Sequence, residues 1–113
     1  MTTHDEQSEG IITGVILQLV RALSPGRIYL FGSQARGDAT YDSDYDLLVV
    51  VPKSEHPRYV REQAAYRALA GHGSGVPIEV MVLTRDEFER ELPVIASLPA
   101  TVAREGRLLY AAA

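Results

Sequence analysis

Two aspartates one residue apart stand directly before an apolar run. Asp44 and Asp46 introduce Leu47-Leu48-Val49-Val50-Val51, a composition that predicts a central strand covered on both faces. Because side chains alternate along a strand, both carboxylates should lie on one face and converge on one point. Two carboxylates that close repel each other unless they are protonated or neutralised, and the usual solution is Mg²⁺ bridged to substrate phosphates. The pair therefore predicts a metal-dependent site that a nucleotide can reach at the rim of a sheet.

A Gly-Ser pair upstream suits the phosphates of such a nucleotide. Gly32 lets the backbone approach a ligand closely, and the N–H groups of a following helical turn favour an anion. The Ser33 hydroxyl can donate a hydrogen bond to a phosphate oxygen, and Arg36 can offer a bidentate fork to the same triphosphate. We predict Gly32, Ser33 and Arg36 as nucleotide-binding residues; the alternative for the last two is a turn hydroxyl and a solvated charge.

A third carboxylate stands alone in another apolar segment. Glu79 lies between Pro77-Ile78 and Val80-Met81-Val82-Leu83, where an unpaired buried charge would be costly. On a strand beside the aspartate pair, Glu79 could complete the metal site and orient or deprotonate an attacking hydroxyl.

These residues together resemble a known signature. Gly32-Ser33, ten residues, then Asp44-Tyr45-Asp46 is similar to the motif of the DNA polymerase β-like nucleotidyltransferase superfamily, over roughly residues 11 to 110. The longer strings resemble its minimal nucleotidyltransferase (MNT) branch: Phe31-Gly32-Ser33-Gln34-Ala35-Arg36-Gly37 and Ser43-Asp44-Tyr45-Asp46-Leu47. The resemblance implies two Mg²⁺ ions on three catalytic carboxylates, namely Asp44, Asp46 and, by position alone, Glu79.

The same resemblance implies a biological role. Many stand-alone members of this branch resemble the antitoxin of a HEPN/MNT toxin–antitoxin pair, in which AMP from ATP is transferred to a tyrosine of a HEPN-domain ribonuclease. We expect that role here, with ATP or another NTP as substrate and a toxin as the partner with which the chain could form an oligomer. One alternative is a non-catalytic module that blocks its partner sterically. A less favoured one is an antibiotic nucleotidyltransferase, which usually brings a further helical domain.

The rest of the chain predicts the elements that must position this site. We expect an α/β (α+β) fold in which helices pack on a small mixed sheet, in one domain over residues 1–113 with a flexible tail over 1–9. The predicted helices and strands are a helix from Ile11 to Leu23, strands at 27–31 and 44–51, a helix over 56–70, a strand over 76–83, a helix capped by Thr84 and Glu87, further helical segments broken near Pro93 and Pro99, and a strand at 108–110.

Composition narrows the partners. A net charge of -4 argues against holding a long nucleic acid, and the apolar run at 11–20 is about half of the roughly 20 residues that a membrane span needs. The absence of cysteine fits a reducing cytoplasm. No zinc site is expected, because the histidines at 4, 56 and 72 lack ligand spacing. Asp38 and Asp42 are interpreted as solvated loop residues.

Overall fold

The computed structural model describes residues 4–39, 44–72 and 76–113. Its elements follow the predicted order and are α1 (His4–Leu23), β1 (Arg27–Phe31), α2 (Ser33–Arg36), β2 (Tyr45–Val51), α3 (Arg58–Leu69), β3 (Ile78–Thr84), α4 (Arg85–Glu91), α5 (Leu98–Glu105) and β4 (Arg107–Ala111).

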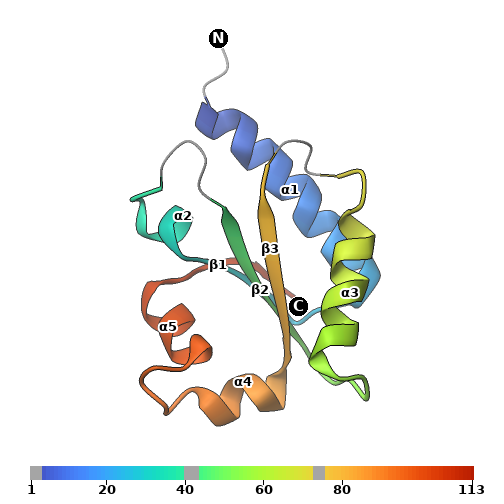
Figure 1. Cartoon of the computed structure of the whole chain (residues 1–113), viewed down its shortest axis with the longest axis vertical. Coiled ribbons are helices and arrows are strands. Elements are labelled where there is room, and N and C mark those ends of the chain that lie inside the picture. The colour runs from blue at the N-terminus through green and yellow to red at the C-terminus, as the bar shows by residue number, and fades with distance from the viewer. Residues whose placement is uncertain (1–3, 40–43, 73–75) are drawn as a thin grey trace.

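The strands form one mixed sheet in the order β3-β2-β1-β4. β2 runs parallel to β3 and antiparallel to β1, and β4 is antiparallel to β1. Figure 1 shows α1 and α3 on one side of this sheet and α4 and α5 on the other. The predicted α/β class with helices on a small mixed sheet is therefore confirmed.

The larger half of the core lies between the sheet and the helices α1 and α3. Val15 and Leu19 of α1 pack there against Leu47 and Val49 of β2, and all four side chains are fully buried. The apolar stripe of the first helix is thus core, as its spacing predicts. Burial of four large aliphatic side chains contributes on the order of 1.5–3 kcal/mol each, which holds β2 in place as the central strand.

The smaller half lies under α4 and α5. Leu48 and Val50, on the opposite face of β2, pack with Phe88 of α4 and Val102 of α5. The predicted capping box at the start of α4 is present. The Thr84 hydroxyl accepts a hydrogen bond from the Glu87 N–H, and the Glu87 carboxylate accepts one from the Thr84 N–H.

Two details of the prediction were wrong. The first helix begins at His4, so residues 4–9 of the expected tail are helical. The buried apolar face anchors the helix, and Glu, Gln and Ser are residue types that allow it to extend toward the N-terminus. Pro99 does not break a helix. It lies in the first turn of α5, after the Ser97 cap, where a backbone N–H would have no partner within the helix, so its absence in proline costs no hydrogen bond. In the part of the chain that the structure describes, none of the helices has the length and apolarity that crossing a membrane requires.

The outer edge of β3 is closed by side chains rather than by another strand. Three alternate backbone N–H groups along this edge donate to side-chain oxygens: Val80 to the Tyr66 hydroxyl at 2.9 Å, Val82 to Glu62 at 3.0 Å and Thr84 to Glu87 at 2.7 Å. Satisfying these donors removes the template for pairing with another chain and holds β3 against α3.

Candidate active site

The end of β1 and the start of β2 meet at one rim of the sheet. Phe31 is paired with Asp46, so the chain leaves β1 at Gly32 directly beside that carboxylate. Gly32 has a φ of 73°, and a Cβ at this position would collide with Asp46 Oδ2. Both the left-handed backbone and the close approach therefore require glycine here, which gives the Gly of the predicted motif a structural reason.

Glu79 lies opposite Asp46 in the parallel ladder. The register pairs Asp46 with Glu79 across β2 and β3, and residues opposite each other in a sheet project from the same face. The Glu79 side chain is solvent-exposed rather than buried, while Asp46 is partly buried. The predicted position of Glu79, on a strand beside the aspartates, is confirmed in geometry.

Negative charges surround the Asp46 carboxyl group. Partial burial is the main cause that raises its pKa, and the charges of Glu79 and Asp44 together with a hydrogen bond to Glu79 raise it further. The positive charge of Arg36 opposes them. The ionised form of Asp46 is thus destabilised by its neighbours, a state that a bound cation would reverse.

Asp44 is the third acidic residue near Asp46 and lies directly before β2. It is exposed, and its charge is among the causes that raise the pKa of Asp46. The convergence of the two aspartates on one point stays a prediction. Among the described residues, no three acidic, histidine or cysteine side chains are arranged as a ready metal-binding cluster. The contact that the structure does show is between the carboxyl groups of Asp46 and Glu79.

The one-turn helix α2 follows Gly32. The Gly32 carbonyl accepts from the N–H groups of Ala35 and Arg36, both at 3.1 Å, and Gly37 ends the turn with a φ of 83°. Ser33 is therefore the first residue of the turn, beside the glycine that contacts Asp46. The predicted tight helical turn is confirmed, and its first residue, Ser33, directly follows the glycine beside Asp46.

Arg36 has acidic partners that the sequence did not indicate. Its Nε lies 3.3 Å from Asp38 Oδ2, and its Nη1 lies 3.5 Å from Glu105 Oε2 of α5. The hydrogen bond to Asp38 and its charge, with a smaller effect of Glu105, raise the pKa of the guanidinium. These contacts are exposed ion pairs, which are weak and can be exchanged for a phosphate.

Other residues singled out from the sequence lie away from the site or outside the described residues. Asp38 is exposed, as expected for a solvated loop residue, but is paired with Arg36. Asp42 lies outside the described residues, as does the Ser43 that belongs to the motif. His56 and His72 are exposed.

Comparisons with known proteins agree with this geometry. The family model of the nucleotidyltransferase domain matches residues 14–109. A search of curated proteins found no match.

Solved structures that resemble the chain include three at under 25% sequence identity, so the likeness of these three concerns the fold. A candidate nucleotidyltransferase from Sulfolobus solfataricus is 20% identical with a TM-score of 0.66, over 93% of this chain and 81% of that one. A toxin–antitoxin with AMP-PNP is 24% identical with a TM-score of 0.51, over 88% and 73%. A mutant of the MntA–HpeT toxin–antitoxin is 19% identical with a TM-score of 0.52, over 88% and 72%.

Proposed function

This chain belongs to the nucleotidyltransferase domain family, and from that premise we propose that it transfers a nucleoside monophosphate from an NTP to a hydroxyl group in a Mg²⁺-dependent reaction. The observation that carries the proposal is the contact of Asp46 with Glu79 at the rim of the sheet, directly beside Gly32. A cluster of repelling carboxylates next to a glycine turn has little value for stability and suits a cation and a triphosphate.

The three carboxylates are the proposed metal-holding groups. Asp46 and Glu79 already touch, and the charge of Asp44 reaches Asp46, so the donor set is all oxygen, as Mg²⁺ prefers. When bound, Mg²⁺ would polarise the α-phosphate and offset the charge of the leaving pyrophosphate. The pKa of Asp46 is raised first by partial burial and then by the charges of Glu79 and Asp44, and a divalent cation would offset these effects by favouring the ionised carboxylate.

Glu79 is the proposed proton acceptor. It is exposed at the start of β3, where an acceptor hydroxyl from another molecule has access. Its carboxylate would orient that hydroxyl and take its proton as the oxygen attacks the α-phosphorus, with pyrophosphate leaving on the opposite side.

The glycine turn is the proposed phosphate cradle. Gly32 lets the backbone approach the triphosphate, and the Ser33 hydroxyl donates to a phosphate oxygen. Arg36 would exchange its exposed contacts with Asp38 and Glu105 for the same phosphates, because a bidentate pair with a phosphate is stronger than a surface ion pair.

The proposed acceptor is a tyrosine of a HEPN-type toxin, with ATP as the donor, so that the chain acts as an antitoxin. Two neighbours in fold are described as toxin–antitoxin structures, and one of them holds AMP-PNP, an analogue of ATP. Their sequence identity is low, so they support this role without carrying it. The motif shared with the MNT branch supports the same role.

The test uses the protein, Mg²⁺, ATP labelled at the α-phosphorus and the product of the adjacent reading frame. We expect label on a tyrosine of the partner, no label from ATP labelled at the γ-phosphorus, and no transfer by Asp46→Asn. Failure to transfer label from any of the four NTPs would reject the enzyme. If Asp46→Asn still neutralised the toxin fully in cells, a steric binding module would replace the catalytic antitoxin.

A further inference from the structure

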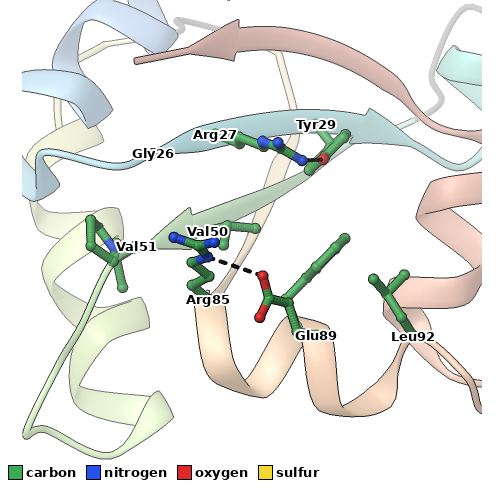
Figure 2. Close-up of a pocket in the computed structure, with 10 residues that line it drawn as sticks. Gly26, Arg27, Tyr29, Val50, Val51, Arg85, Glu89 and Leu92 are labelled. Atoms are coloured by element: carbon green, nitrogen blue, oxygen red, sulfur yellow. Dashed lines mark hydrogen bonds and ion pairs between the residues drawn. The ribbon is translucent and has the colours of Figure 1, made fainter. Parts of the chain in front are cut away.

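A cavity lies at the other end of the same strands. It has a volume of about 340 Å³ and is formed where β1 begins, where β2 ends and along one side of α4 (Figure 2). The lining residues come from three separate stretches of the chain, and those used below are Arg27, Tyr29, Val50, Arg85, Phe88 and Glu89. A volume of this size is within the range of small-molecule sites.

This cavity is distinct from the candidate active site. The antiparallel register pairs Arg27 with Val50 at the cavity. It pairs Phe31 with Asp46 at the acidic centre, the group formed by Asp44, Asp46 and Glu79. Arg27 and Phe31 are four residue steps apart along β1, which corresponds to roughly 13 Å, and Tyr29, which also lines the cavity, is two steps from Phe31. The apolar cluster under α4 and α5, including Leu48, fills the space between the cavity and the acidic centre, so one small ligand would not occupy both.

Apolar side chains form part of the cavity wall. The rings of Tyr29 and Phe88 stack with centroids 5.8 Å apart and planes 4° from parallel. Val50 is buried in the same cluster, and its carbonyl accepts from the Gly26 N–H at 2.8 Å, which ties the two strand ends together. These walls favour an apolar ring or chain over water.

The polar groups of the cavity favour an anion. Two guanidinium groups line it, Arg27 from β1 and Arg85 from α4, against one carboxylate, Glu89 (Figure 2). The formal charge of the lining is therefore about +1, opposite in sign to the net charge of -4 of the whole chain.

The donors at this cavity are easily redirected to a ligand. Arg27 Nη1 donates to the Tyr29 hydroxyl at 3.0 Å, an arrangement that turns the phenol's own proton away from Arg27. Arg85 pairs with Glu89 at 3.0 Å, but their side chains are 72% and 54% exposed. An exposed pair of this kind is weak, so Arg85 loses little by exchanging Glu89 for another carboxylate.

We propose that this cavity binds a carboxylate carried on an apolar body, with the body against Val50 and the stacked rings and the carboxylate between Arg27 and Arg85. A free aryl or alkyl carboxylate has this chemistry, and so does an apolar C-terminal residue of a protein. The inference does not depend on nucleotidyl transfer, since it rests on residues outside the acidic centre.

The test is a titration of the full chain by two-dimensional NMR with three probes. Benzoate should give saturable shifts at the amides of residues 26–29, 50 and 85–89. Benzamide, which lacks the charge, and acetate, which lacks the apolar body, should each bind about fivefold to tenfold more weakly. A Gly-Gly-Phe peptide with a free C-terminus, compared with its amide, distinguishes the protein source from the free acid.

Single-residue variants locate the anion. Arg85→Gln and Arg27→Gln should each weaken benzoate binding about fivefold, because each removes one charge-assisted hydrogen bond. Arg90→Gln removes an exposed arginine from the same helix outside the cavity and should leave binding unchanged. The proposal is overturned if benzoate gives no saturable shift up to about 20 mM, if benzamide binds equally well, or if the arginine variants match Arg90→Gln.

Discussion

The two ends of β3 hold carboxylates in opposite electrostatic situations. At its start, Glu79 is paired with Asp46, and partial burial together with the charges of Glu79 and Asp44 raises the pKa of Asp46. At its end, Glu87 is bound in two places by buried Arg61, with N–O distances of 2.7 and 3.1 Å, and its pKa is lowered to about 2.

This difference distinguishes the candidate active site from a structural ion pair. The Arg61 pair joins α3 to α4, and Glu87 also accepts from the Thr84 N–H, so that carboxylate has its charge matched and its hydrogen bonds made. The Asp46 carboxyl group instead has the charges of Glu79 and Asp44 nearby, and the positive charge of Arg36, which is itself paired with Asp38 and Glu105, offsets them only in part. A fold tolerates such repulsion where a bound ligand relieves it, and strained or electrostatically mismatched groups are common at functional sites.

The largest effect is expected from removing the charge of Asp46 or Asp44. Asp46→Asn and Asp44→Ala should each lower kcat about a thousandfold or more, because a metal carboxylate acts on the transition state. Asp46→Asn should also unfold at no lower temperature than the wild type in EDTA, since it relieves repulsion. Asp86→Asn, an exposed acid on α4, is the matched control; wild-type turnover in either aspartate variant would contradict the assignment.

The next effect tests the close approach of the backbone to the carboxylate. Gly32→Ala should lose about a hundredfold in kcat/KM, because its Cβ displaces the Asp46 carboxylate. Gly37→Ala has a similar left-handed φ of 83° but nothing within 4 Å of an added Cβ. The ψ values differ, at 9° for Gly37 and -158° for Gly32, and the second conformation is much less accessible to alanine. Urea unfolding should therefore show a loss of about 1 kcal/mol for Gly37→Ala and about 1–3 kcal/mol for Gly32→Ala. Equal turnover in the two variants would show that the contact with Asp46 is unimportant.

A milder effect is expected at the phosphate cradle. Ser33→Ala should lower kcat/KM about tenfold to a hundredfold, the effect of losing one hydrogen bond to a charged group. Most of the change should be in KM for the NTP, because a phosphate contact acts on nucleotide binding. Ser33→Thr keeps the hydroxyl and should recover most of the loss. Equal activity of the alanine and threonine variants would remove Ser33 from the site.

The smallest effect is a pH dependence of stability at the other end of β3. The folded pKa of Glu87, about 2, lies below its ordinary value of 4.5, so its stabilisation is complete above about pH 4.5 and is lost as the pH falls toward 2. With this side chain 37% exposed, we expect a loss of at most about 2 kcal/mol.

Urea unfolding in EDTA between pH 2.5 and 6 measures this loss, and Glu87→Gln should flatten the profile. Asp46 contributes with the opposite sign, because its raised pKa means that protonation favours the folded state. Asp46→Asn should therefore steepen the loss of stability in acid. A profile that neither variant changes would show that the contrast between the two ends of β3 is not electrostatic.

Much of this molecule could be predicted from local patterns. The helix periodicity at 11–23, the apolar run after Asp46 and the capping residues Thr84 and Glu87 each depend on neighbours within a few positions, and the structure confirms all three. The Gly-Ser turn with its aspartate pair indicates the family for the same reason, since one turn and one strand end contain the whole motif.

Tertiary packing decided what joins distant segments. Helix α1 starts earlier than its apolar stripe. Arg36 forms an ion pair with Glu105 of α5, and Arg61 of α3 forms one with Glu87 of the α4 capping box. The cavity is built from three stretches that no sequence window contains. The sequence by itself indicated the family and the candidate site residues, because the spacing of the motif is local. Only the fold decided which charges are matched by a partner, because that depends on which elements pack together.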